Sequence, residues 1–288
     1  MTAFHWLASY PKSGNTWFRI LVAHLFAKDA VPLDINALPT GFIASSRNLF
    51  DTVTMLDSGL LTHDEIDAIR PSVYAALSRA QDMPEINTSG LMKVHDAYTR
   101  LPDGRPLLGG KEAAKGAILI VRDPRAIAAS LANHNGSGIG DAIEMINNPR
   151  GVWCNQLDRQ HRQLRHWLLD WSGHVGSWLE QTELPVHVLR YEDLRTNTAR
   201  CLREAMTFWG RNITLDEANM AAELSRFEVL SAQEKDRGFR GAILGRTFFR
   251  KGESDGWKRE LSREQIVKIE RSHGEMMKRL GYDLTTEG

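Results

Sequence analysis

The sequence of 288 residues predicts an α/β fold with a central, mostly parallel β-sheet flanked by helices. Three apolar runs have the length of a strand, and each is followed by a segment with helical spacing. One run is almost continuously apolar, which is typical of a strand buried inside a parallel sheet. Because ligands of such folds collect beyond the carboxyl ends of the strands, we expect functional residues to follow these runs.

The first predicted strand covers residues 4–9, with the sequence FHWLAS. A turn with proline, serine and glycine follows, and then a helix over residues 16–26 in which apolar side chains recur every three or four positions. The loop between them lies at the amino end of a helix, where backbone N–H groups and the helix dipole favour an anion.

The second predicted strand is the almost continuously apolar run GAILIVRDP, residues 116–124. Pro124 suits the first turn of the helix PRAIAASLANH that follows it. The third predicted strand covers residues 185–194 and precedes a helix over residues 198–210, which Gly210 would end. Strands and helices therefore alternate along the chain.

Two regions, around residues 32–90 and 135–180, carry weaker signals. The first is partly helical and partly irregular, and the second is rich in glycine, asparagine, tryptophan and histidine. We interpret both as insertions that could cover a substrate. Because the chain has no repeat, low-complexity tract or linker-like composition, residues 1–288 are expected to form a single domain.

The charge balance of the chain restricts its partners. The 36 basic and 36 acidic residues give a formal net charge of zero, which argues against a dedicated nucleic-acid binder. Nothing in the sequence approaches the roughly 20 apolar residues of a membrane span, and no signal peptide is evident. We expect a cytoplasmic protein that neither binds nucleic acid nor inserts into a membrane.

The loop after the first strand, YPKSGNTW, has the ingredients of an anion site. Lys12 supplies a mobile charge, Gly14 lets the backbone approach a ligand closely, and the hydroxyls of Ser13 and Thr16 are donors. Its glycine follows the lysine, unlike the order in the nucleoside-triphosphate motif G-x-x-x-x-G-K-[ST]. The alternative is an ordinary turn in which Thr16 is the N-cap of the helix.

This loop resembles the 5′-phosphosulfate loop of the cytosolic-type sulfotransferases, which use 3′-phosphoadenosine 5′-phosphosulfate (PAPS). The segments LIVRDPRAIAAS, RYEDL and FFRKGESDGWK are similar to the family's 3′-phosphate motif, its adenine-contacting strand end and its C-terminal R-K-G-x-x-G-D-W-K element. The four segments occur in the family's order over residues 4 to about 260. The opening WLASYPKSGNTW looks closer to bacterial sulfotransferases than to animal phenol or steroid enzymes. The resemblance implies the P-loop-like fold of that family.

The resemblance also implies how the two phosphates of PAPS are held. Lys12 would contact the phosphosulfate, and the 5′-phosphate would be held by Ser13, Gly14, Asn15 and Thr16. Arg122 and Ser130 would clamp the 3′-phosphate, because a guanidinium fork and a hydroxyl match its tetrahedral oxygens. The residues that complete the same anion site would be Arg250, Lys251 and Gly252. The alternative for Arg122 is an ion pair with Asp123 or another nearby acid.

Aromatic residues would contact the adenine. The resemblance implies that Trp17 stacks on it, and that further contacts come from Tyr191, Ser225 and Phe227. The alternative for Trp17 is a place in the core on the first helix, since an aromatic residue at helical spacing is usually core. The chain departs from the family at Asp255 and Gly256, which stand in exchanged order, so the geometry of that loop is left open.

The segment LMKVHDAY resembles the family's K-T-H element, with Lys93 and His95 in the matching positions. Residues two apart in a strand share a face, so both side chains are expected to point the same way. Histidine suits a general base because its ordinary pKa of about 6.5 lets it accept a proton near neutral pH. His161 and His166 are five apart, miss the spacing of a helical metal pair, and are assigned no chemistry.

The implied reaction is in-line transfer of a sulfuryl group from PAPS to a hydroxyl or an amine of a small-molecule acceptor, which leaves PAP. His95 would remove the acceptor proton, and Lys12 and Lys93 would neutralise charge on the oxygens. The family needs no metal; Asp123 and Asp193 are the nearest candidates for a magnesium-binding acid. The alternatives are a nucleotide or small-molecule kinase and a non-catalytic nucleotide-binding protein. The oligomeric state is left open.

Overall fold

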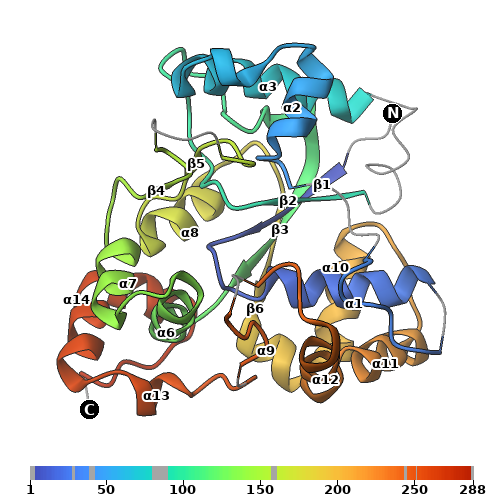
Figure 1. Ribbon diagram of the computed structural model, residues 1–288, viewed down its shortest axis with the longest axis vertical. Helices are drawn as coiled ribbons and strands as arrows, with labels where there is room; N and C mark the ends of the chain where they lie inside the picture. Colours follow the sequence, from blue (N-terminus) through green and yellow to red (C-terminus); the bar gives the residue numbers. More distant parts are fainter. Residues whose placement is uncertain are drawn as a thin grey trace. The chain divides into compact units, whose positions relative to one another are not determined.

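The computed structural model describes residues 4–27, 30–38, 43–79, 90–156, 161–242, 245–250 and 252–286 (Figure 1). The chain divides into two compact units. Unit one comprises Met1–Tyr10, Gly41–Leu119 and Asn148–Val188, and unit two comprises Pro11–Thr40, Ile120–Asn147 and Leu189–Gly288. The expected single domain over residues 1–288 stays a prediction.

A four-stranded sheet has the strand order β2-β1-β3-β6. Its strands are β1 Phe4–Ser9, β2 Leu91–Val94, β3 Ala114–Val121 and β6 Val186–Arg190. β1 and β2 pair in parallel, with His5 opposite Leu91 and Ala8 opposite Val94. Every residue of β1 is buried, and so is every residue of β3 except Lys115, as expected for inner strands covered on both faces. The predicted α/β fold with a central parallel sheet is confirmed.

Helices fill most of the remaining described chain (Figure 1). Those whose residues belong to unit one are α2 Arg47–Thr54, α3 His63–Arg79, α5 Gly110–Ala113 and α8 Trp171–Glu180, with a 3₁₀ turn at Ser58–Leu60. Unit two holds α1 Asn15–Ala27, α6 Pro124–Asn135, α7 Ile139–Ile146, α9 Tyr191–Thr196, α10 Thr198–Phe208, α11 Leu215–Leu224, α12 Phe227–Arg237, α13 Trp257–Glu260 and α14 Arg263–Arg279. A short antiparallel pair, β4 Val152–Trp153 and β5 His166–Trp167, completes unit one.

The predicted elements around the motifs are confirmed, and two strand ends are corrected. The second strand, predicted over residues 116–124, covers Ala114–Val121. The first strand and the helices after the first two strands lie where they were expected, and α6 begins at Pro124 with Asp123 as its N-cap. The third strand, predicted to reach Leu194, ends at Arg190, because Tyr191 begins α9. Two acidic residues, Glu192 and Asp193, lie in the first turn of that helix, where they complement its dipole.

Both predicted insertions contribute to the core of unit one. Tyr74 of α3 meets Trp6 of β1 edge to face, with 5.1 Å between the ring centroids. Trp171 and Trp178 of α8 are fully buried. Residues 39–42, 80–89 and 157–160 of these regions lie outside the described residues. That the two regions also cover an acceptor stays a prediction.

Across the ranges that the structure describes, no helix combines the length and the apolar character needed to cross a bilayer. The longest, α3 and α14, have 17 residues each and carry charged side chains along their length.

Two histidines in the core of unit one are held neutral. His166 and His174 are both fully buried, and burial lowers the pKa of each from 6.5 to about 4. The nearby Asp96 carboxylate acts in the opposite direction on both, but it does not outweigh the loss of hydration. These rings are therefore uncharged in the native protein at neutral pH.

Lowering the pH from 7 to 5.5 is expected to destabilise the protein through these two histidines. Their native pKa lies below that of the unfolded chain, so within this window only the unfolded chain takes up their protons. The stability that each contributes is complete above pH 6.5, and about 1 kcal/mol of it is lost at pH 5.5. Urea unfolding at the two pH values measures the change.

The double variant His166→Gln/His174→Gln lacks both titrating rings and serves as the comparison. Its free energy of unfolding should change by about 2 kcal/mol less than that of the wild type between pH 7 and 5.5. An equal change in the two proteins would contradict the prediction.

Candidate functional site

The loop that precedes α1 has an unusual backbone. Lys12 has φ of 70° and Gly14 has φ of 104°, both in the left-handed region, whereas Ser13 between them does not. A lysine in this region costs roughly 1–2 kcal/mol, so the surrounding structure must impose it. Alternation of this kind turns successive N–H groups toward one side and forms a concavity that suits an anion.

The start of α1 supports an anion site over an ordinary capped turn. The helix begins at Asn15, and the Phe18 N–H donates to the Gly14 carbonyl at 3.1 Å. Thr16 therefore lies inside the first turn, and the alternative in which it is the N-cap is wrong. The Ser13 hydroxyl is fully buried and has no hydrogen-bond partner in the part of the chain that the structure describes. A buried donor of this kind costs free energy until it finds an acceptor.

Tyr191, the first residue of α9, lies against this loop. A Cβ atom on Gly14 would come within 2.5 Å of the Tyr191 ring, so only glycine fits at this position. The Arg122 guanidinium lies over the same ring at 4.3 Å, and Trp17 meets it edge to face at 5.8 Å between centroids. Three separate motifs of the sequence thus converge within unit two.

Arg122 follows β3 and is aligned by the loop itself. Its Nη1 donates to the Lys12 carbonyl at 3.0 Å, and its buried Nε has no partner among the described residues. The alternative ion pair with Asp123 is wrong, because the Asp123 carboxylate pairs with Arg125 at 2.7 Å. The Arg122 Nε–H is therefore a buried donor of the kind that a bound anion accepts.

The Lys12 ammonium lies 4.1 Å from the centroid of the Phe248 ring, in a cation–π contact. The pKa of Lys12 is lowered from 10.5 to about 8, mainly by burial and also by the Arg122 charge, while Glu234 acts in the opposite direction. Two neighbouring cations in a buried place make a site that gains free energy from a bound anion.

The segment around Phe248 is held by Glu234 of α12. The two carboxylate oxygens of Glu234 accept the N–H groups of Phe248 at 2.6 Å and Phe249 at 2.8 Å. Farther along, Arg250 pairs with Glu260 at 2.6 Å, and Gly252 packs so closely on Phe227 that a Cβ atom would be 2.5 Å from that ring. Lys251 lies outside the described residues.

The remaining predicted nucleotide residues have contacts of their own in unit two. The fully buried Ser225 places its hydroxyl 3.1 Å from His24 Nδ1, and its carbonyl accepts Trp17 Nε1 at 2.9 Å. Phe227 and Trp17 both pack against a cluster formed by Ile20, Ile35, Leu230 and Phe249. Ser130 lies half-buried in α6, eight residues after Arg122. Trp17 is thus both a packing residue and a neighbour of Tyr191.

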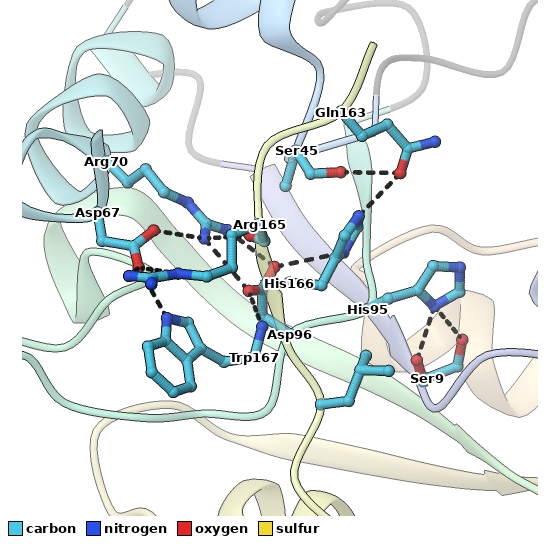
Figure 2. Close-up of polar contacts among 12 residues, drawn as sticks. Ser9, Ser45, Asp67, Arg70, His95, Asp96, Gln163, Arg165, His166 and Trp167 are labelled. Atoms are coloured by element: carbon cyan, nitrogen blue, oxygen red, sulfur yellow. Dashed lines mark hydrogen bonds and ion pairs between the residues drawn. The ribbon is translucent and has the colours of Figure 1, made fainter. Parts of the chain in front are cut away.

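The predicted base lies in unit one, directly after β2. His95 Nδ1 is 2.8 Å from the Ser9 carbonyl and 3.3 Å from the Ser9 hydroxyl (Figure 2). A carbonyl oxygen only accepts, so Nδ1 carries the proton and Nε2 keeps its lone pair in the neutral ring. This is the tautomer that a general base acting through Nε2 requires.

His95 is also held uncharged. Burial lowers its pKa well below 6.5, Lys93 and His166 lower it further, and the bond to the Ser9 carbonyl opposes them. Lys93, half-buried in β2, is close enough to affect this titration. The ring is therefore neutral and able to accept a proton at pH 7.

The sequence did not reveal the polar cluster behind His95, which consists of Asp67, Arg70, Asp96, Arg165, His166 and Trp167 (Figure 2). The ring of His166, to which no chemistry was assigned, lies 6.2 Å from that of His95. The one sequence signal for this cluster is Asp96, a charged residue close to the end of a buried strand. Its arginine partner is 26 residues away, and no local pattern connects the two.

Comparison with known proteins matches most of this chain to one family. Residues 5–281 match the family described as Sulfotransferase domain. Cytosolic sulfotransferase 15 of Arabidopsis thaliana is 24% identical over 273 residues, which cover 91% of this chain and 68% of that protein. Flavonol 3-sulfotransferase of Flaveria bidentis is 24% identical over 278 residues, which cover 92% of this chain and 78% of that protein.

Two solved structures have a similar fold. One is retinol dehydratase in complex with androsterone and the inactive cofactor PAP, at 18% identity and a TM-score of 0.59, covering 97% of this chain and 81% of that one. The other is the mouse sulfotransferase SULT7A1 complexed with PAP, at 16% identity and a TM-score of 0.57, covering 98% and 87%. At these identities the likeness shows the fold alone.

Gly14→Ala is expected to destabilise the protein by about 2–4 kcal/mol. About 1 kcal/mol comes from forcing alanine into a left-handed φ, and the remainder from the overlap of its Cβ with the Tyr191 ring. Gly104→Ala is the matched control, because Gly104 has φ of 85° but nothing within 4 Å of an added Cβ. It should cost only about 1 kcal/mol in guanidinium unfolding. Equal losses in the two variants would show that Tyr191 does not restrict Gly14.

Proposed function

This chain belongs to the sulfotransferase family, and we propose that it transfers a sulfuryl group from PAPS to a hydroxyl or an amine of a small-molecule acceptor. The observation that carries the proposal is the loop before α1. There a strained backbone, a half-buried lysine and a serine hydroxyl lie beside an arginine; the buried serine hydroxyl and the buried arginine Nε–H have no hydrogen-bond partner among the described residues.

Lys12 and the residues after it would hold the 5′-phosphosulfate. The buried Ser13 hydroxyl and the backbone N–H groups of the first turn of α1 are donors of the kind that a phosphate accepts. Lys12 would neutralise the bridging oxygen, where charge gathers as the sulfuryl group leaves. The loop residues assigned to the phosphate are Ser13, Gly14, Asn15 and Thr16.

The second phosphate of the nucleotide distinguishes this proposal from triphosphate binding. Arg122 and Ser130 would clamp the 3′-phosphate, together with Arg250 and Gly252. Lys251, outside the described residues, is assigned to the same anion. Arg250 pairs with Glu260 at 2.6 Å, so contact with phosphate would require it to leave or share that partner.

The aromatic residues near the loop would contact the adenine. Trp17 and Tyr191 are neighbours, which supports their common assignment. Phe227 packs on Gly252, so it lies beside a residue assigned to the nucleotide. Ser225 is assigned a contact with the same base, although its hydroxyl already lies next to His24.

His95 would supply the base for transfer. Its Nε2 accepts the acceptor proton while the new bond from the acceptor atom to sulfur forms and the bond from sulfur to the bridging oxygen breaks. The electron pair of the broken bond remains on that oxygen, beside Lys12, and Lys93 would neutralise charge on the oxygens of the sulfuryl group. No covalent intermediate with the chain is needed.

The acceptor is proposed to be a hydroxylated or amino small molecule. The named relatives include a flavonol sulfotransferase, and a structure of similar fold holds androsterone. We retain a closer likeness to bacterial sulfotransferases as part of the proposal, although the relatives named above come from plants and an animal. Cytoplasmic location and the lack of nucleic-acid and membrane partners are likewise proposed.

The deciding experiment combines ligand binding with product detection. Thermal shift with PAP, ATP and ATP plus Mg²⁺ should show strong stabilisation by PAP, because a ligand stabilises the state that binds it. A panel of hydroxylated and amino acceptors incubated with PAPS should then yield a product whose mass has increased by one sulfonate. Stabilisation by ATP with Mg²⁺ but none by PAP would refute the proposal in favour of a kinase.

His95→Asn is expected to lower kcat by about 10²–10⁴-fold while leaving PAP affinity unchanged. Asparagine can keep the hydrogen bond to the Ser9 carbonyl, but it has no atom in the place of Nε2. His95→Ala removes both and should be equally inactive. Steady-state kinetics and PAP titration measure the two quantities. Wild-type kcat in either variant would mean that another group takes the proton.

The kcat/KM for PAPS is expected to fall as the pH rises above about 8. The pKa of Lys12 is lowered to about 8, so in the free enzyme its charge is lost above that pH. On the acid side, kcat/KM should fall only well below pH 6.5, where His95 becomes protonated, so it is constant around neutral pH. Lys12→Arg keeps its charge and should lose the alkaline limb, although its maximal rate is lower. An unchanged limb near pH 8 in this variant would assign that titration to another group.

A further inference from the structure

The segment that carries His95 is clamped at its next residue, Asp96. The Asp96 carboxylate accepts Arg70 Nη2 at 2.8 Å and Arg70 Nη1 at 3.2 Å (Figure 2). Both side chains are fully buried. Burial pushes the pKa of Asp96 upward, but Arg70 outweighs it, so the net shift is downward and the carboxyl group stays ionised. This is an ion pair in the core, one residue from the proposed base.

The same residue is fixed through its backbone and by β5. Asp96 Oδ1 also accepts the Trp167 N–H at 2.9 Å, and the Ala97 N–H donates to the Trp167 carbonyl at 2.7 Å. From α8, Trp178 Nε1 donates to the Asp96 carbonyl at 3.1 Å. The chain on the carboxyl side of His95 is therefore held by α3, β5 and α8 together.

Arg70 is itself held in one position. Its Nε donates to the Tyr74 hydroxyl at 2.9 Å, and its Nη1 donates to the Arg165 carbonyl at 3.0 Å and to Asp67 at 3.2 Å. Asp67 in turn accepts Trp167 Nε1 at 2.7 Å. A guanidinium with this many partners is a rigid support for the carboxylate that it faces.

We propose that Asp96 is a positioning residue for His95: held by Arg70, Trp167 and Trp178, it fixes the backbone so that His95 Nδ1 stays on the Ser9 carbonyl and Nε2 keeps its lone pair. On the other side of His95 the chain is β2, paired in register with β1. The inference rests on the proposed function in that it assigns the base to His95. It adds that the orientation of the His95 ring is set by the next residue in the chain, whose carboxylate bonds to Arg70 and Trp167 while the imidazole bonds to Ser9.

The role can be tested without leaving an unpaired charge in the core. Removing one partner of a buried pair is strongly destabilising, whereas replacing both by neutral residues often is not. The two variants are Arg70→Met/Asp96→Asn and Arg70→Met/Asp96→Leu. Neither carries the ion pair, but only asparagine keeps an oxygen that can accept the Trp167 N–H.

The leucine variant is expected to lose about tenfold or more in kcat, with KM values for PAPS and acceptor within about twofold of wild type. The asparagine variant should recover kcat to within about threefold. A residue that only stabilises the fold would produce no such difference at temperatures well below both melting midpoints. Tyr98→Phe, which removes the bond from Tyr98 to Glu183 in the same segment, is the control and should keep wild-type kcat.

A second readout does not depend on turnover. Nitrogen-15 spectra of the imidazole, assigned by comparison with His95→Asn, should show the Nδ1-protonated form in the wild type and in the asparagine variant. The leucine variant should show an average of both tautomers. Wild-type kcat together with an unchanged tautomer in the leucine variant would overturn the proposal.

Two further outcomes remain decisive. If the leucine variant does not fold, Trp178→Phe, which removes the Trp178 Nε1 bond together with part of the buried ring, should lower kcat several-fold. An unchanged kcat and tautomer in that variant would overturn the proposal. If the wild type transfers no sulfuryl group, the proposed function fails, while the imidazole spectra still decide whether Asp96 orients His95.

Discussion

A buried charge must be paired, and this requirement organises both units of the protein. In unit one, Arg70 and Asp96 face each other with no exposure to solvent, and the strand end that carries His95 is fixed by them. In unit two, Arg125 joins Asp123 at the start of α6 to Glu270 of α14 and lies over the Trp257 ring. The Arg70–Asp96 and Arg125–Glu270 pairs connect segments far apart in the chain, whereas Asp123 and Arg125 are two residues apart, so it is the two long-range pairs that hold the fold in one arrangement.

In the candidate nucleotide site, some buried polar groups have no partner among the described residues. Lys12 and Arg122 lie near each other, and burial together with the Arg122 charge lowers the pKa of Lys12. Ser13 adds a buried hydroxyl with no acceptor in the described chain. A protein tolerates the free-energy cost of an unpaired buried polar group where a bound ligand supplies the missing partner. The strained φ of Lys12 has a related role, because a backbone shape imposed by the fold keeps the N–H donors aligned before a ligand binds.

The proposed base, His95, is kept uncharged, in contrast to the cations Lys12 and Arg122 of the nucleotide site. His95 is kept neutral by burial and by Lys93, and the Ser9 carbonyl selects its tautomer. A base of low pKa is a weak one, so the neighbouring positive charges must help by stabilising the oxygens of the transferred group. In the proposed reaction, electrostatic stabilisation and proton removal would then be divided between lysines and histidine.

The sequence by itself determined the α/β class, the strand at residues 4–9, the helix at Pro124 and the family motifs, because apolar periodicity and short motifs are local properties. It did not determine where the third strand ends, since Tyr191 and Leu194 suit a strand by composition, whereas in the structure Tyr191 begins α9 and its ring lies against Gly14. The tertiary structure alone decided that Gly14 faces Tyr191, that Arg125 of α6 pairs with Glu270 of α14, and that Asp96 lies on Arg70. These contacts join residues whose separation in sequence carries no period, so they exist only once the chain is packed and its buried charges have found their partners.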